Sequence, residues 1–231
     1  MLKLINLNIK IKGQEKNLIE NFNLEMESGK IYTLNGKNGS GKSSLLSAIM
    51  GHPNYEIVGG SMEIISATDP SKGRKIELNS VSSSVNSGIY MTMQQVPEIE
   101  GVTLIQLLHK ALSKKSTDSK NECIGLGILD LNKKLLEYAE RFNIDKSFIT
   151  RDLNYKMSGG EKKQAELLHL LALKPQYVLI DEIDSGVDRE SIEKIYQVIK
   201  FLQEEYGSSF LIVSHHTEVS SFVDVTKMYN I

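Results

Sequence analysis

Cysteine is almost absent from this sequence, since Cys123 is the single one among 231 residues. One thiol cannot form an internal disulfide, which suits a reducing compartment. It also cannot hold an iron–sulfur cluster through thiolates alone, because such clusters take several cysteine ligands. We therefore expect the cytoplasm, or the equivalent matrix or stroma of an organelle, and no resident cluster.

Excess charge and long apolar runs are also lacking. The 27 Lys and Arg residues nearly balance the 29 Asp and Glu residues, which leaves a net charge of −2. This balance gives no electrostatic basis for binding nucleic acid or a membrane surface. No run approaches the ~20 apolar residues of a spanning helix, so we expect no direct membrane insertion. The length and the 40% apolar content suit one large domain over 1–231, with room for a subdomain.

The segment from Gly36 to Ser43 fits the phosphate-loop pattern G-x-x-x-x-G-K-[ST]. An apolar run, 31–34, precedes it and a helical apolar pattern follows it, so a chance glycine-rich turn is the weaker interpretation. In such a loop, backbone N–H groups face the phosphates at a helix N-terminus. Lys42 would add a charge, and the Ser43 hydroxyl could coordinate Mg²⁺. The predicted nucleotide-binding residues are Gly36, Asn38, Gly39, Ser40, Gly41, Lys42, Ser43 and Ser44.

Two acids, Asp181 and Glu182, follow the apolar run 177–180, which predicts a central strand. Asp181 would bind hydrated Mg²⁺, and Glu182 would polarise the attacking water; a positioned base contributes about 10²–10⁴-fold to rate. The alternative interpretation is a solvated strand end with two ordinary acids, and the presence of Lys42 in a phosphate loop makes this alternative less convincing. His215 follows another buried strand, 210–213, and could contact a γ-phosphate or be merely structural.

A second helix start, Ser158-Gly159-Gly160, could bind an anion or could be a plain cap. Because a phosphate loop already exists, two anion-binding helix ends in one subunit predict that two subunits enclose two nucleotides.

The overall pattern predicts an α/β fold. Apolar residues alternate with polar ones in 7–11 and 23–27, which indicates antiparallel strands. A purely helical stretch then interrupts the strand–helix alternation, so we expect an inserted helical subdomain at about 96–173. The serine-rich segment 66–87 is interpreted as a surface excursion without a required function.

Together these segments resemble the ATP-binding-cassette (ABC) ATPases, over nearly the whole chain. The resemblance implies a P-loop NTPase core with an antiparallel β subdomain and the helical insertion, together with ATP, Mg²⁺ and ATP-dependent homodimer contacts. It implies these roles: Lys42 and Ser43 in Walker A; Gln94 as the Mg²⁺- and water-contacting glutamine; Ser158, Gly159 and Gly160 at the trans γ-phosphate; Asp181 and Glu182 in Walker B; Ser185 to Asp188 as the D-loop; and His215 as the switch histidine. Gln94, Lys42, Glu182 and His215 form the implied catalytic set, and Ser43, Gln94 and Asp181 the implied metal set.

A narrower resemblance is to SufC, the ATPase subunit of the Suf iron–sulfur cluster assembly machinery. It rests on four segments: Gly51 to Glu56, Gln94 to Val102, Arg151 to Asn154, and Asp181 to Asp188. The last has a second acid, Asp184, next to Glu182, and Lys162 or Lys163 could pair with one of these two acids. This resemblance implies SufB/SufD-like scaffold partners that would carry the metal chemistry.

Two other functions share the catalytic motifs. A nucleotide-binding subunit of a membrane transporter would share every catalytic motif, so the distinction rests only on the segments 182–184 and 51–56. A DNA-repair or chromosome-organising head would need long coiled-coil insertions, which this sequence does not have.

Overall fold

A computed structural model describes residues 1–65, 74–76, 80–92, 97–113, 121–182, 186–213 and 219–231. The chain divides into two compact units. The first contains residues 1–92, 175–182 and 207–231, and the second contains residues 93–174 and 183–206. The helix that follows Asp188 belongs to this second unit.

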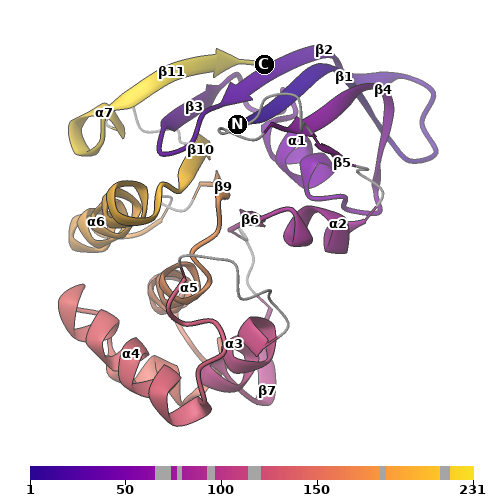
Figure 1. The fold of residues 1–231 in the computed structure, drawn as a ribbon. Helices are drawn as coiled ribbons and strands as arrows, with labels where there is room; N and C mark the ends of the chain where they lie inside the picture. The colour runs from indigo at the N-terminus through magenta and orange to yellow at the C-terminus, as the bar shows by residue number, and fades with distance from the viewer. Residues whose placement is uncertain (66–73, 77–79, 93–96, 114–120, 183–185, 214–218) are drawn as a thin grey trace. The chain divides into compact units, whose positions relative to one another are not determined.

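An antiparallel sheet forms one part of the first unit (Figure 1). Its strands are β1 (Leu2–Ile11), β2 (Asn17–Met26), β4 (Tyr55–Ile64) and β5 (Arg74–Ile76), in the order β2-β1-β4-β5. The predicted alternation places Leu4 opposite Leu24 and Met62, and all three side chains are buried. A register shift between Leu4 and Leu7 brings Leu7 into the core as well.

A five-stranded parallel sheet forms the other part of the first unit. Its strands are β3 (Ile31–Asn35), β6 (Ile89–Met91), β9 (Tyr177–Asp181), β10 (Ser209–Val213) and β11 (Val225–Asn230), in the order β11-β3-β10-β9-β6. Every residue of β9 and β10 is buried, as expected for central strands covered on both faces. Helix α1 (Lys42–Ile49) packs against β4 and β9, and α7 (Val219–Phe222) is short. The predicted fold class, a mixed α/β core with parallel and antiparallel strands, is confirmed.

The serine-rich segment contributes more to the core than its composition predicts. It holds β5 and helix α2 (Val81–Asn86), which Ser80 caps by accepting a hydrogen bond from the Ser83 N–H at 3.3 Å. The Ser84 side chain is fully buried and donates to the Ile49 carbonyl at 2.8 Å. Composition missed this packing because a buried serine with a partner looks the same in sequence as a solvated one.

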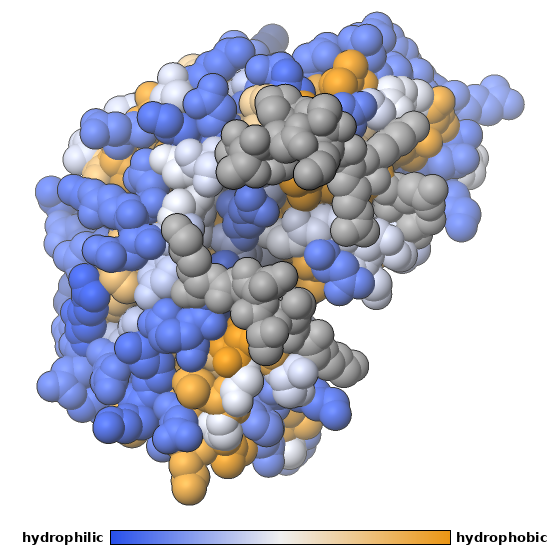
Figure 2. All heavy atoms as spheres, in the orientation of Figure 1, coloured by the Kyte–Doolittle hydropathy of each residue, from blue (hydrophilic) through white to orange (hydrophobic). Residues whose placement is uncertain are grey.

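The second unit is mainly helical, with a small antiparallel pair of strands. Its elements are β7 (Ile99–Thr103), α3 (Leu104–Ser113), α4 (Ile128–Arg141), a 3₁₀-helix (Lys146–Ile149), β8 (Asp152–Leu153), α5 (Gly159–Leu173) and α6 (Arg189–Tyr206). Helix α5 packs against α3, α4 and α6. Hydrophilic residues cover most of the face drawn in Figure 2, while apolar ones emerge in small groups. Among the described residues, no helix combines the length and apolar character needed to cross a bilayer.

Candidate nucleotide-binding site

The loop from Gly36 to Gly41 joins β3 to α1 in the first unit, and three glycines determine its shape. Gly39 and Gly41 have φ values of 79° and 102°, in the left-handed region that glycine adopts readily. A Cβ on Gly36 would lie 2.6 Å from the Ser40 Oγ and 2.7 Å from the Ile231 carbonyl oxygen. The tight turn therefore requires glycine at these positions, and it lets backbone N–H groups approach a ligand closely.

The Lys42 ammonium is folded back over this loop. Its Nζ donates to the carbonyls of Gly36 at 2.9 Å and Lys37 at 3.0 Å, and the residue is only 7% exposed. The Ser40 hydroxyl is buried and, within the described part of the chain, has no hydrogen-bond partner. An ammonium, a free hydroxyl and a helix N-terminus at one loop fit a phosphate group.

A hydroxyl and a carboxylate meet beside the loop. Ser43 Oγ, in the first turn of α1, donates to the Asp181 Oδ1 at 3.1 Å. Asp181 ends β9 and is 3% exposed, and its own N–H donates to the Thr92 Oγ1 at 3.2 Å. Hard oxygen donors of this kind suit Mg²⁺, which takes one or two carboxylates and keeps several waters. Among the described residues, no group of three or more His, Cys, Asp and Glu side chains is arranged to hold a metal ion.

Glu182 follows Asp181 in an unusual backbone conformation. Its φ is 51°, and its N–H donates to the Val213 carbonyl of the neighbouring strand at 3.0 Å. A left-handed residue other than glycine costs about 1–3 kcal/mol and persists where its surroundings enforce it, often at functional sites. Glu182 opens onto a cavity of about 420 Å³ with these lining residues: Ile11, Leu18, Asn38, Gly39, Gly41, Lys42, Ser43, Ser44 and Glu182. The cavity thus brings together the phosphate loop and the predicted base.

The second predicted anion site starts α5 in the second unit. Ser158 Oγ accepts from the Glu161 N–H at 3.3 Å, and the Glu161 carboxylate accepts from the Ser158 N–H at 2.7 Å. This is a capping box, and these hydrogen bonds lower the pKa of Glu161. Among the residues that the structure describes, nothing lies within 4 Å of a Cβ added to Gly159 or Gly160, so none of these residues requires glycine at either position. Internal packing therefore does not explain why two glycines stand there.

Asp188 caps the start of α6 in the same unit. Its Oδ1 accepts from the Ser191 N–H at 2.9 Å and its Oδ2 from the Ser191 hydroxyl at 3.1 Å, which lowers the pKa of Asp188. Lys162 forms an ion pair with Glu98 at 2.6 Å, within the same unit. Gln94, His215 and the segment 183–185 lie outside the described residues.

Sequence reasoning missed several residues around the loop. Thr92 holds the Asp181 N–H, and the Tyr55 hydroxyl accepts from the Ser44 Oγ at 3.2 Å. Ile11 and Leu18 supply the aliphatic part of the cavity lining. The pairing of β6 with β9 brings Thr92 next to Asp181, and no local sequence motif predicts that pairing.

Comparison with known proteins gives the following likenesses. The family described as "ABC transporter" matches residues 19–185. "Vegetative protein 296" of Bacillus subtilis is 30% identical over 223 residues, which is 96% of this chain and 80% of that protein. A "Probable ABC transporter ATP-binding protein" of Streptococcus pyogenes is 32% identical over 225 residues, covering 96% and 82%. The "Iron-sulfur cluster assembly protein SufC" of Plasmodium falciparum is 34% identical over 213 residues, covering 91% of this chain but 58% of that protein.

Solved structures share the fold over nearly the full length. A dimeric ATP-binding cassette in a post-hydrolysis state, bound to ADP and Pi, superposes with a TM-score of 0.77 at 23% identity and covers 100% of this chain and 96% of that one. A nucleotide-free ATP-binding cassette from an ABC transporter has a TM-score of 0.72 at 20% identity and covers 99% and 87%. At these identities the likeness concerns the fold.

Proposed function

The chain belongs to the ABC family of ATPases, and we propose that it hydrolyses ATP as a homodimer to drive conformational change in an iron–sulfur cluster assembly scaffold. The observation that carries the catalytic part of the proposal is the contact of Ser43 with Asp181 beside Lys42, at a cavity that Glu182 also lines. This arrangement supplies phosphate contacts, two metal ligands and a base within a single unit of the chain.

The roles of the residues in the first unit follow from this geometry. The Lys42 ammonium would leave its loop carbonyls for the β- and γ-phosphate oxygens, since a phosphate is the stronger partner. Ser43 and Asp181 would hold Mg²⁺, which, when bound, neutralises charge on the phosphates. Glu182 would accept a proton from the attacking water, a contribution of about 10²–10⁴-fold. Gln94 and His215 keep the roles that the family resemblance implies, at the metal and at the γ-phosphate.

The second unit would act on the nucleotide of a partner subunit. The helix start Ser158-Gly159-Gly160 can face an anion through its backbone N–H groups. No described residue would clash with a larger side chain at either glycine. In the dimer, these residues of one copy would contact the γ-phosphate held by the other, with Asp188 near by. ATP would then join the two copies, and hydrolysis would release them.

The scaffold partner is supported by sequence. The SufC protein of Plasmodium falciparum is 34% identical over 91% of this chain. The second acid, Asp184, and the segment 51–56 agree with the same resemblance. Cys123 alone cannot build a cluster, so SufB/SufD-like partners would carry it, in the cytoplasm or an equivalent organelle compartment.

A transporter subunit is the second candidate, favoured by the names of the Streptococcus relatives. Affinity purification of a tagged Glu182→Gln variant in the presence of ATP distinguishes the two. Recovery of a scaffold protein that carries or builds iron–sulfur clusters supports the first candidate, and recovery of an integral membrane permease supports the second. The same variant also tests dimerisation: ATP should shift it from monomer to dimer in analytical ultracentrifugation. A variant that binds ATP and stays monomeric at every concentration, with the scaffold present, contradicts the proposed mechanism.

A further inference from the structure

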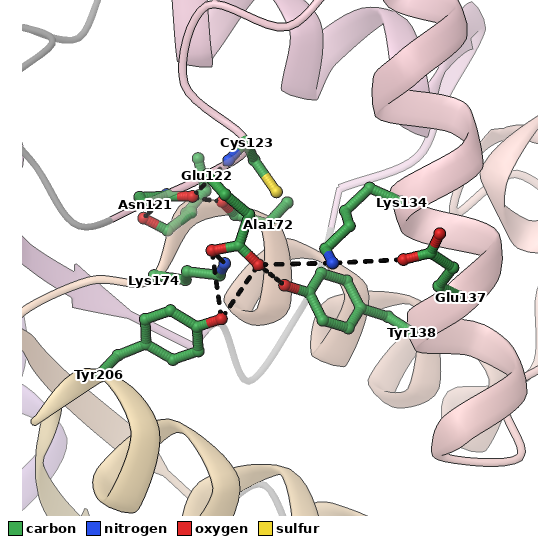
Figure 3. A network of polar contacts seen from close by, with 10 residues as sticks. Asn121, Glu122, Cys123, Lys134, Glu137, Tyr138, Ala172, Lys174 and Tyr206 are labelled. Carbon is green, nitrogen blue, oxygen red and sulfur yellow. Dashed lines mark hydrogen bonds and ion pairs between the residues drawn. The ribbon is translucent and has the colours of Figure 1, made fainter.

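Four side chains connect the ends of three helices in the second unit (Figure 3). The Glu122 carboxylate accepts hydrogen bonds from the Tyr138 hydroxyl at 2.8 Å and from the Tyr206 hydroxyl at 3.0 and 3.2 Å. The Lys174 ammonium forms an ion pair with the same carboxylate. Tyr138 belongs to α4, Lys174 directly follows α5, and Tyr206 is the last residue of α6. We call these four residues the Glu122 junction.

Lys174 is the buried cation at the centre of this junction. Its side chain is 1% exposed, and its Nζ lies 4.0 Å from the ring centroid of Tyr206 and 5.5 Å from that of Tyr138. The two aromatic faces attract a cation but do not neutralise it. A buried ammonium is stable only with an opposite charge near by, so Lys174 depends on the ionised form of Glu122.

Glu122 is in turn attached to the C-terminal end of α5. The Asn121 side chain donates to the carbonyls of Ala172 at 2.8 Å and Leu173 at 3.0 Å, while its Oδ1 accepts from the Cys123 N–H. Partial burial works to raise the pKa of Glu122, but hydrogen bonds from Lys174, the backbone and Tyr138 outweigh it and leave that pKa at about 2. The Glu122 carboxylate is therefore ionised at neutral pH, as its ion pair with Lys174 requires.

The functional residues stand at the opposite ends of the joined helices. Helix α5 begins after Ser158 and ends at the junction, and α6 begins after Asp188 and ends at the junction. Helix α5 has 15 residues, so its two ends are about 22 Å apart. At that distance a tilt of about 3° moves the far end by about 1 Å, and a misplacement of this size can cost about 10²-fold in rate.

We propose that Glu122 and Lys174 are positioning residues of the ATPase reaction, which hold α5 and α6 in the one relative orientation that presents Ser158 to Gly160 and Asp188 correctly to the nucleotide of a partner subunit. The proposal rests on the proposed dimeric mechanism. Glu122 and Lys174 would thus affect the rate of ATP hydrolysis without touching the nucleotide or the metal.

The test is a comparison of Glu122→Gln with the double variant Glu122→Gln/Lys174→Met. Glutamine keeps the shape and an acceptor but removes the charge, so Lys174 loses its counterion among the described residues. We expect kcat to fall at least about 10-fold, while the KM for ATP and the Kd for ADP stay within about 2-fold, because the phosphate loop belongs to the other unit. Removing both charges should restore kcat to within about 3-fold of the native protein.

Glu140→Gln is the matched control, since Glu140 forms an exposed ion pair with Lys146 in the same unit at 2.9 Å and should leave kcat unchanged. Tyr206→Phe provides a milder variant in case Glu122→Gln does not fold. It loses the hydrogen bond to Glu122 and keeps the ring beside Lys174, so we expect a kcat lower by about 3-fold at an unchanged KM. The proposal is overturned if folded Glu122→Gln has the kcat of the native protein. If Glu122→Gln does not fold, the same result in Tyr206→Phe overturns it. A double variant whose kcat is no higher than that of Glu122→Gln also overturns it.

These outcomes are separate from those of the proposed function. If the native protein does not dimerise with ATP, the dimeric mechanism fails before the junction is tested. If the native protein dimerises and hydrolyses ATP, and the junction variants match it in kcat, only the positioning role fails.

Discussion

The Ser43 hydroxyl donates a hydrogen bond to the Asp181 carboxylate over 3.1 Å, although 138 positions separate the two residues in the sequence. One stands in the first turn of α1 and the other at the carboxyl end of β9. Open α/β sheets place ligands at that end of their strands. The contact therefore joins the two motifs on which the proposed nucleotide chemistry depends, and it exists within one unit of the chain.

Loss of the Lys42 ammonium should mainly weaken nucleotide binding. Hydrogen bonds to a charged group contribute about 1.5–3 kcal/mol, so Lys42→Ala should weaken ATP binding by about 10- to 100-fold or more. Isothermal titration calorimetry with ATP at fixed Mg²⁺ measures this directly. Lys37→Ala is the control, because the loop uses only the carbonyl of Lys37 and the substitution keeps it. Equal affinities of the two variants for ATP would show that Lys42 does not bind the phosphates.

Substitutions of Ser158 separate its capping role from its proposed contact with a partner's nucleotide. Aspartate is as good an N-cap as serine, so Ser158→Asp should keep the stability of α5, whereas Ser158→Ala should lose about 1 kcal/mol. The added carboxylate would, however, face the γ-phosphate, and we expect turnover of Ser158→Asp to fall by about 100-fold. Thermal unfolding and steady-state ATPase assays together give both quantities. If the cap is the whole role of Ser158, the aspartate variant will be the more active of the two.

Much of this site could be predicted because it is encoded locally. The phosphate loop follows from its glycine spacing, and Asp181 follows from the apolar strand before it. The capping box of Ser158 and Glu161 was also readable, since serine followed three residues later by glutamate is its sequence signature. These features need no knowledge of how distant segments pair.

Other features depend on contacts that no short pattern contains. Thr92 reaches Asp181 only because β6 pairs with β9, and these residues are 89 positions apart. The Glu122 junction needs α4, α5 and α6 together, and no short sequence pattern connects Glu122, Lys174 and Tyr206. The left-handed backbone of Glu182 likewise depends on the neighbouring Val213 carbonyl.

Acid should weaken the Glu122 junction in a defined pH range. The folded-state pKa of Glu122 is about 2, below its ordinary value of 4.5, so its stabilising effect is complete above about pH 5 and is lost as pH falls towards 2. The groups facing it are Lys134, Lys174, Tyr138, Tyr206 and Cys123. We expect the difference in melting temperature between the native protein and Glu122→Gln to be largest above pH 5 and to vanish near pH 2. A difference that stays constant over this range would show that the charge of Glu122 does not contribute.

Thr92 should matter for stability and for the metal site, although it touches neither phosphate nor metal. Its Oγ1 accepts the Asp181 N–H at a position that is 1% exposed. Thr92→Val has nearly the same shape but leaves this buried N–H without its acceptor, which costs about 1–3 kcal/mol. We expect a lower free energy of unfolding in urea and, because Asp181 is then less well fixed, a higher Mg²⁺ concentration for half-maximal ATPase activity. Thr92→Ser keeps the hydroxyl and should retain the native Mg²⁺ dependence. If valine and serine at this position give the same Mg²⁺ dependence, the hydroxyl of Thr92 plays no part in orienting Asp181.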